Sequence, residues 1–449
     1  MPSNRHTRVV GAGLVSLLAL LAGCATPAPR LVSPPPTTSL RPVTATDVAA
    51  DAPGPTPSTG GIRPGTRFTP IAVSVLTVPR AVKSADGRFH LAYELILTNA
   101  TRTSVRIDRL RVRRVAPAGP GHTTRRVVQS LTAARLWHAT NPLGGESAKG
   151  QTTLAASSTW TVWMDVSFAT KAAVPTRMDH RFTGTITTPD GRRFPLDAVV
   201  ARMRPDRAAP VVLGAPVLHG TWYASDSCCT HDTHHRRGLV PINGNLQVPQ
   251  RYAIDWYRLD AKHRSWVGDP TKLTNYLTYR EPVIAAAGGT VVAARDGLPN
   301  SKPPEPPTIP PILETVGNHV IVRIAPGTYV LYSHFDPGTV KVHVGQHVRK
   351  RQLLGLIGTS GNSTTPHLHF QVLTKPTFFS ADSPPFVFDR FTLVGQVTKR
   401  IWDDNIGLQP TPVLPFVAAK PRTVHHNEMP LDRNVIRFGP AEPRRSCRR

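Results

Sequence analysis

Two histidines separated by a single residue, His367 and His369, form the segment that most clearly indicates chemistry. They follow a loop rich in Gly, Ser, Asn and Thr (residues 358–366) and lead into the apolar residues Phe370 and Val372. Successive side chains of a strand point to opposite faces, so both imidazoles would project from one face. One can then bind a metal ion while the other faces a substrate near the loop's backbone N–H groups. The segment predicts a strand that carries a metal ligand and a reacting group.

Two more polar residues stand at the ends of apolar segments. His334 ends the segment 330–334 and precedes turn residues, and polar groups at strand ends commonly line functional sites. Asp255 ends the segment 251–255, where a carboxylate is out of place unless it is paired or bound to a metal. Asp255 is therefore a candidate metal ligand, and His334 a candidate neighbour of the site.

A second metal ligand is expected upstream of Asp255. His231, His234 and His235 precede Asn243-Gly244, a hairpin turn signal. Folding the chain about that turn sets Asp255 opposite the histidines. One histidine, Asp255 and His369 would then give three protein ligands and leave a fourth position open, as a catalytic zinc site requires.

Four segments carry a family resemblance: residues 332–334 (Tyr-Ser-His), 345–348 (Gly-Gln-His-Val), 355–358 (Gly-Leu-Ile-Gly) and 361–370 (Gly-Asn-Ser-Thr-Thr-Pro-His-Leu-His-Phe). They resemble the lysostaphin-type zinc metallopeptidases, and the likeness covers about residues 234–374. The resemblance implies a β-rich fold of the duplicated hybrid kind, Zn²⁺ as the cofactor, and hydrolysis of peptide bonds in peptidoglycan cross-links or stems.

The resemblance also implies a role for each candidate residue. Asp255 and His369 would be zinc ligands. His334 and His367 would be catalytic groups beside the zinc-bound water, which they would orient or deprotonate while stabilising the developing oxyanion. Peptidoglycan peptides are the expected substrate.

The first zinc ligand departs from the family pattern. The family commonly shows a compact His-x-x-x-Asp, but Arg251 stands four residues before Asp255. The histidine must come from farther upstream, and we choose His235, with His234 next and His231 last. A relative that has lost ligands would be a catalytically silent scaffold or regulator of other wall hydrolases. Because the other ligands are present, we favour the enzyme.

The elements that position these residues are predicted to be strands. In residues 67–206 apolar residues alternate over 89–97 and 160–168, with Gly-containing turns beside them, which predicts an immunoglobulin-like β-sandwich. Residues 211–402 contain further short apolar segments and most of the clustered histidines, and form the predicted zinc metallopeptidase domain. The predicted fold class is all-β, with the sandwich preceding a β-rich duplicated-hybrid-motif domain.

Three further segments are predicted to lie outside the folded domains. Residues 1–23 have two arginines, an apolar run and small residues before Cys24, as in a bacterial lipoprotein signal peptide whose cysteine is lipidated. Residues 24–66 are rich in Pro, Thr and Ser and predict a disordered tether. Residues 420–449 are basic and irregular and predict a disordered tail. The protein is therefore expected to be exported and anchored to the bacterial membrane by lipid.

Three cysteines remain if Cys24 carries lipid. Cys228 and Cys229 are adjacent, and neighbouring cysteines rarely bond to each other because the small ring is strained. A bridge from one of them to Cys447 is the expected pairing.

The charge points to a polyanionic surface. Lys and Arg number 54 against 28 Asp and Glu, which gives a net charge of +26. Such a protein is drawn to nucleic acid, anionic membrane or cell wall. The arginines are scattered rather than collected on one helix with interleaved aromatics, so no nucleic-acid partner is expected. Protein partners are not predicted.

Overall fold

The structure is a computed structural model that describes residues 68–120, 122–143, 150–305, 311–405 and 412–439. The predicted signal peptide, the tether and the lipidation site at Cys24 lie outside the described residues, as does Cys447. Among the described residues, none of the helices is long and apolar enough to cross a membrane. Residues from Thr69 onward form one compact unit.

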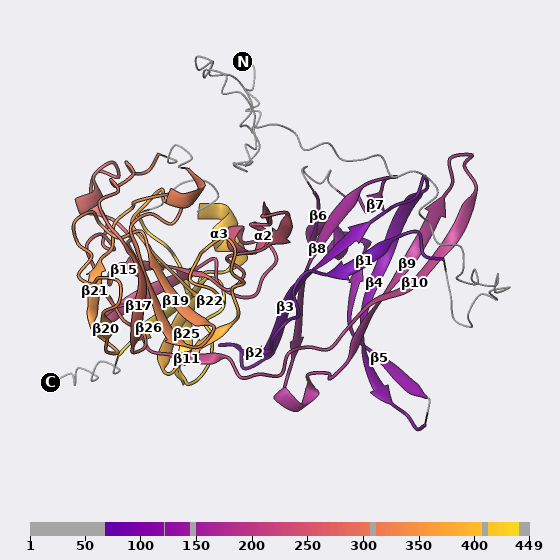
Figure 1. Cartoon of the computed structure of the whole chain (residues 1–449), viewed down its shortest axis with the longest axis horizontal. Coiled ribbons are helices and arrows are strands. Elements are labelled where there is room, and N and C mark those ends of the chain that lie inside the picture. The colour runs from indigo at the N-terminus through magenta and orange to yellow at the C-terminus, as the bar shows by residue number, and fades with distance from the viewer. Residues whose placement is uncertain (1–67, 121, 144–149, 306–310, 406–411, 440–449) are drawn as a thin grey trace, which may run out of the picture. The chain divides into compact units, whose positions relative to one another are not determined.

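The first part of this unit consists of two antiparallel sheets (Figure 1). One has the order β1-β3-β8-β6, with β2 paired to β3, and the other has the order β10-β9-β4-β5, with β7 paired to β4. Their strands are β1 (Ala72–Val75), β2 (Val82–Lys83), β3 (Phe89–Thr98), β4 (Ser104–Pro117), β5 (Thr123–Thr132), β6 (Thr140–Pro142), β7 (Thr153–Leu154), β8 (Thr159–Phe168), β9 (Met178–Thr187) and β10 (Arg193–Met203). Helix α1 (Ala133–His138) and the 3-10 helix η1 (Lys171–Ala173) connect strands.

Both sheets contribute to one hydrophobic core. The alternation in β3 buries Leu91, Tyr93 and Leu95, which pack with Ile107 of β4 and Phe182 of β9. Two sheets that share a core in this way make a β-sandwich, called the sandwich below (residues 69–206). Its immunoglobulin-like topology stays a prediction.

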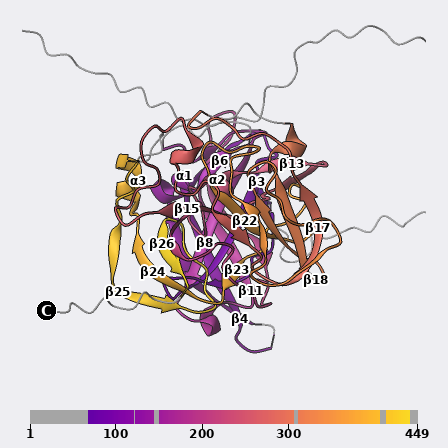
Figure 2. The same cartoon turned by 90° about the vertical axis from the view of Figure 1, so that its left-hand side faces the viewer.

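The second part is built on a ten-stranded sheet with the order β20-β17-β18-β19-β22-β15-β12-β26-β24-β25. Its strands are β12 (Gly220–Ser225), β15 (Ile254–Leu259), β17 (Gly289–Arg295), β18 (His319–Ala325), β19 (Thr328–Ser333), β20 (His347–Val348), β22 (Leu368–Leu373), β24 (Phe391–Gln396), β25 (Val417–His425) and β26 (Asn434–Phe438). Figure 2 shows β24 and β25 at one side of the view and β17 and β18 at the other. The predicted all-β class is confirmed.

Short elements complete this part. Two-stranded sheets pair β11 (Val211–Leu213) with β23 (Phe386–Phe388), β13 (Val240–Ile242) with β14 (Asn245–Gln247), and β16 (Pro282–Ile284) with β21 (Leu353–Leu356). The helical turns are α2 (His234–Arg237), η2 (Leu273–Asn275), η3 (Ile312–Glu314) and α3 (Lys399–Asn405). The hairpin predicted at Asn243-Gly244 joins β13 to β14, and both turn residues have positive φ, 49° and 76°.

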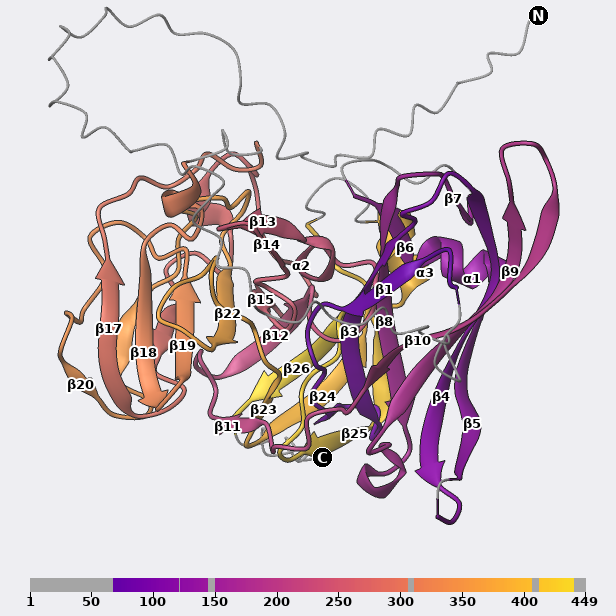
Figure 3. The same ribbon diagram turned by 45° about the vertical axis from the view of Figure 1, so that its right-hand side comes forward.

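The centre of the ten-stranded sheet positions the candidate site. Strand β22 lies between β19 and β15, as Figure 3 also shows. The register sets His369 opposite Asp255 on one side and opposite Ser333 on the other. Apolar residues of the same strands, among them Phe370 and Tyr332, are fully buried and hold this register.

The predicted disordered tail is wrong for residues 420–438. Strands β25 and β26 belong to the ten-stranded sheet, and β26 lies between β12 and β24. Val435 and Ile436 of β26 are fully buried. The apolar segment is short and follows a basic one, and its partner strand β12 lies about two hundred residues earlier, so the local pattern did not reveal it.

The predicted bridge to Cys447 is also wrong, because Cys228 and Cys229 are bonded to each other. Both side chains are buried in the hydrophobic core.

Candidate metal centre

The structure brings five sequence-predicted residues together. Asp255 lies in β15 and His369 in β22, and Oδ1 of Asp255 is 2.9 Å from Nδ1 of His369. His334 directly follows β19, His367 directly precedes β22, and His235 lies in α2. All five side chains are buried. They come from four separate segments, so the site is a product of the sheet and not of one motif.

Three of the histidines are held by backbone carbonyl groups. In each case Nδ1 lies within hydrogen-bond distance of carbonyl oxygens: those of Asp226 (3.0 Å) and Ala253 (3.3 Å) for His235, Ser360 (2.7 Å) for His334, and Thr365 (2.8 Å) for His367. A carbonyl oxygen only accepts, so Nδ1 must carry the proton and donate. Nε2 of His235, His334 and His367 is then left with a lone pair.

In His369 the two ring nitrogens have the opposite roles. Its Nε2 lies 2.7 Å from Oε1 of Gln371, whose Nε2 donates to the carbonyl oxygen of Pro249 at 2.8 Å. That second bond fixes the amide so that Oε1 is the acceptor. His369 therefore carries its proton on Nε2 and turns the lone pair of Nδ1 towards Asp255.

One ligand atom is left without a partner. Nε2 of His235 is buried and has no hydrogen bond, and it lies 3.5 Å from Oδ2 of Asp255. An unsatisfied buried polar atom costs about 1–3 kcal/mol. A cation between the two would satisfy the nitrogen and the carboxylate together. His235, Asp255 and His369 provide two imidazoles and a carboxylate, a ligand set that binds zinc and leaves a fourth position open. These residues therefore fit zinc.

Burial sets the protonation states that such a site needs. It lowers the pKa of His235 to about 3 and lowers the pKa values of His334 and His367, so these imidazoles are neutral near pH 7. Burial alone would raise the pKa of the Asp255 carboxyl, but its contacts with the surrounding histidines hold the pKa well below its usual range, so the carboxylate is ionised. Neutral imidazole and ionised carboxylate are the forms that bind a metal ion.

The two alternative first ligands are placed less well. The side chain of His234 is 62% exposed, with Nδ1 2.9 Å from Oδ1 of Asp226 and Nε2 3.9 Å from Oδ2 of Asp255. His231 offers its carbonyl oxygen to Arg237 at 2.6 Å. The choice of His235 as the first ligand stays a prediction, and the geometry favours it over both.

Two residues of the site were missed from the sequence. Gln371 stands two residues after His369 and so on the same face of β22, which is a usable signal in an otherwise apolar strand. Asp226 gives its carbonyl oxygen to His235 and its carboxylate to His234. It follows β12 with a positive φ of 57°, and nothing in its sequence neighbourhood marks it.

Comparison with known proteins adds a family. The model of "Peptidase family M23" matches residues 275–379. Residues 275–379 form a peptidase family M23 domain. Family M23 consists of metallopeptidases in general and also contains inactive members. The match includes His334, His367 and His369, whereas His235 and Asp255 precede it.

One curated relative matches a short part of the chain. The cell division protein DipM of Caulobacter vibrioides is 30% identical over 96 residues, which cover 21% of this chain and 13% of that protein. The match therefore spans a small fraction of that relative's length.

Solved structures are also similar to part of the chain. The catalytic domain of the antimicrobial peptidase lysostaphin from Staphylococcus simulans is 22% identical, covering 37% of this chain and 89% of that chain at a TM-score of 0.21. The SpoIIQ–SpoIIIAH pore-forming complex matches at 19% identity, 39% and 90% coverage and a TM-score of 0.22. The M23 metalloprotease pseudoalterin matches at 15% identity, 37% and 72% coverage and a TM-score of 0.21.

Within the M23 domain, the described start of a Pro-rich segment, residues 299–305, lies beside the loop that leads to His367. Oδ1 of Asn300 accepts from the backbone N–H of Thr359 at 2.8 Å, and the Ser301 hydroxyl donates to the carbonyl oxygen of Gly361 at 3.1 Å. The described start of this segment is therefore hydrogen-bonded to the Gly-rich loop. Residues 306–310 lie outside the described residues.

Proposed function

We propose that this protein is a zinc-dependent endopeptidase that hydrolyses peptide bonds of bacterial peptidoglycan in cell-wall remodelling. The observation that carries the proposal is the unpartnered Nε2 of His235, which faces the same carboxylate as Nδ1 of His369. Together with Asp255 these atoms form a ligand set of the kind found in catalytic zinc sites.

Two further imidazoles are available for proton transfer. Bound zinc supplies positive charge that polarises a peptide carbonyl and acidifies water at its open position. Nε2 of His334 and Nε2 of His367 carry lone pairs and can take the water proton or, once protonated, donate a hydrogen bond to the developing oxyanion. Their rings lie 4.8 Å apart between centroids, and Tyr257 stacks on His367 at 5.3 Å, which limits its rotation.

The substrate class rests on the family and on charge. The lysostaphin-type resemblance, and a relative that is named as a cell division protein, favour peptidoglycan peptides as the substrate. The net charge of +26 would hold the protein on anionic wall polymers. No nucleic-acid partner is part of the proposal.

Export and lipid anchoring complete the proposal. The apolar run after Arg5 and Arg8, which ends in small residues before Cys24, supports a lipoprotein signal. In cells fed a labelled fatty acid, the wild-type protein should carry the label and sediment with membranes. A Cys24→Ser variant that is labelled as strongly as the wild type would contradict the anchor.

The catalytic claim is tested with the purified full chain. Bound zinc is measured by elemental analysis, and new amino termini are counted after incubation with peptidoglycan. We expect one zinc per chain and release of termini, and we expect His367→Ala to keep zinc and lose about 10²–10⁴-fold in rate. A zinc-free chain without hydrolysis would instead support a silent scaffold that regulates other wall hydrolases.

A further inference from the structure

Arg251 occupies the position of the expected histidine ligand but makes different contacts. Arg251 stands four residues before Asp255, where the compact His-x-x-x-Asp pattern has its histidine. Its guanidinium points away from the site towards Glu94 of β3 in the sandwich. Nε lies 3.1 Å from both carboxylate oxygens of Glu94, and Nη2 lies 2.8 Å from Oε2. Both side chains are buried, and Glu94 is 0% exposed.

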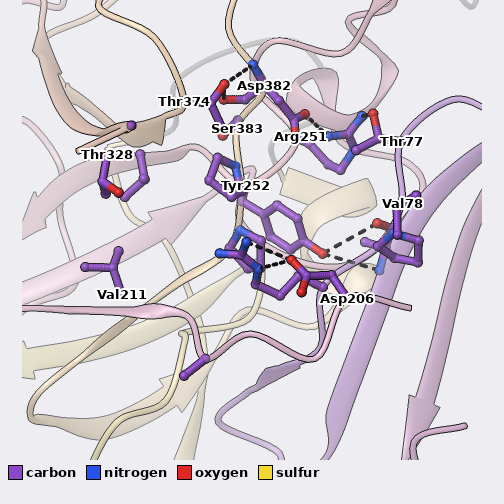
Figure 4. Close-up of a pocket in the computed structure, with 18 of the residues that line it drawn as sticks. Thr77, Val78, Asp206, Val211, Arg251, Tyr252, Thr328, Thr374, Asp382 and Ser383 are labelled. Carbon is purple, nitrogen blue, oxygen red and sulfur yellow. Dashed lines mark hydrogen bonds and ion pairs between the residues drawn. The ribbon is translucent and has the colours of Figure 1, made fainter. Parts of the chain in front are cut away.

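Arg251 has further partners on both sides of this contact. Nη2 donates to the Thr77 hydroxyl at 3.0 Å, and Nη1 pairs with Asp382 (Figure 4). Tyr252, the next residue, packs against β3, where its hydroxyl accepts from the backbone N–H of Ala92 at 3.4 Å. The start of the segment that delivers Asp255 is thus fixed on the sandwich.

The segment that delivers His235 is fixed on the same strand. Arg236, the residue after His235, is fully buried, and its Nη2 lies 3.5 Å from Oε1 of Glu94. The same nitrogen donates to the carbonyl oxygens of Met164 (3.1 Å) and Tyr93 (3.5 Å) in the sandwich. One carboxylate of the sandwich therefore pairs with two arginines that flank the ligand-bearing segments.

Helix α2 depends on such contacts. It has only four residues, too few for a helix to be stable by itself. Arg237 adds a second anchor, because it pairs with Asn141 and its Nη2 donates to the carbonyl oxygen of His138 at 2.6 Å. The contacts of Arg236 and Arg237 with the sandwich therefore set the position of His235.

We propose that the sandwich supports the metal centre. Glu94 pairs with Arg236 and Arg251, and through these two arginines it positions His235 and Asp255. The inference rests on the proposed zinc site and concerns how that site is assembled. Glu94, Arg236 and Arg251 are positioning residues, since none of them contacts the proposed ligand atoms. The sandwich is then required for zinc binding.

The physical reason is the cost of buried charge. Without the Glu94 carboxylate, the buried guanidinium groups of Arg236 and Arg251 both lose a negative partner. Removing one partner of a buried ion pair leaves an uncompensated charge that draws the segment towards water. Because zinc–ligand distances tolerate deviations of only about 0.2 Å, a small shift of α2 against β15 lowers zinc affinity.

The test measures zinc affinity of full-length variants by competition with a chromogenic chelator. We expect Glu94→Gln and Arg236→Met to weaken zinc binding about tenfold or more, as loss of supporting contacts commonly does. Asp179→Asn is the matched control. Asp179 is a buried carboxylate of the same sandwich, 1% exposed, and binds Arg113 at 2.6 and 3.0 Å without touching α2 or β15. It should unfold more easily than the wild type and keep the wild-type zinc affinity.

The possible outcomes separate this inference from the proposed function. A wild-type chain that binds no zinc overturns both. A zinc-binding wild type with equal affinities for Glu94→Gln and Asp179→Asn overturns the inference alone. If circular dichroism shows Glu94→Gln to be unfolded, Glu94→Asp decides, because it keeps the charge but shortens the reach to both arginines: weakened zinc binding supports the inference, and unchanged binding overturns it.

Discussion

Nδ1 of His369, and not Nε2, faces Oδ1 of Asp255 at 2.9 Å across the paired strands β22 and β15. Directly opposite residues of an antiparallel pair have Cβ atoms about 4.5–5.5 Å apart, so the sheet itself sets the separation of these two proposed ligands. Which nitrogen is presented is decided elsewhere, by the amide of Gln371. This arrangement makes the proposed zinc site sensitive to a residue that would not touch the metal.

Replacing Gln371 with Leu should lower zinc affinity about 10–100-fold, the usual effect of losing the partner that fixes a histidine ligand. The ring of His369 would lose the acceptor that keeps the proton on Nε2. Chelator competition measures the affinity, and ¹⁵N chemical shifts of the zinc-free protein report the tautomer of His369. Gln396→Leu is the control, because Gln396 ends β24, which is separated from β22 by three strands in the sheet order, and its amide donates to the carbonyl oxygen of Asp432 at 3.1 Å. Equal affinities for the two variants would refute this role.

His234 and His235 provide a matched pair of adjacent histidines. His235→Ala should lose stoichiometric zinc, since it removes the buried nitrogen that has no other partner. His234→Ala should keep zinc, because that side chain is largely exposed and pairs with Asp226. Elemental analysis of the two purified variants checks this. The opposite result, with zinc lost only from His234→Ala, would move the first ligand by one residue.

The sequence reveals the parts of the site that follow from local patterns. Period-two alternation puts His367 and His369 on one strand and also makes Asp255 conspicuous in an apolar segment. The hairpin signal at Asn243-Gly244 gives the direction of the chain between the proposed ligands. These features depend on a few neighbouring residues and can therefore be predicted from the sequence.

The remainder depends on contacts between distant segments. In the sequence, Arg236 and Arg251 look like two of many scattered arginines. Their partner Glu94 lies 142 and 157 residues earlier, and no nearby residue indicates the pairing. The same holds for β26, whose strand partners are β12 and β24. A buried ion pair or a strand pairing of this range is fixed by the folded core and has no local signature.

Zinc should stabilise the protein against heat, because a ligand that binds only the folded state adds free energy of unfolding. With free zinc at a hundred times its Kd the gain is about 2.7 kcal/mol. Differential scanning calorimetry with zinc and with a chelator measures the change in Tm. His367→Ala should keep the increase, since His367 is assigned to proton transfer, and Asp255→Asn should lose most of it. A zinc-independent Tm in the wild type would contradict the proposed site.

A second cluster of polar residues, in the sandwich, predicts a pH dependence that has nothing to do with zinc. Nδ1 of His90 lies 3.0 Å from Asp165, and Nε2 lies 3.1 Å from Asp86. Burial alone would lower the pKa of His90, but hydrogen bonds to Asp165 and Asp86 raise the pKa to about 9. Both ring nitrogens are occupied by carboxylates, so the group is an ion-paired histidine and not a metal ligand.

His90 should stabilise the fold most at low pH and lose this effect as the pH rises. Its unfolded pKa is about 6.5, so the folded chain holds the extra proton between about pH 6.5 and pH 9, and the stabilisation disappears across that window. In urea unfolding of the zinc-free protein, the wild type should lose on the order of 3 kcal/mol more than His90→Gln between these limits. Asp432, whose pKa burial and the Asp226 charge raise to about 8, titrates in both proteins and cancels in the comparison. Equal losses in the two proteins would show that the carboxylates do not hold a proton on His90.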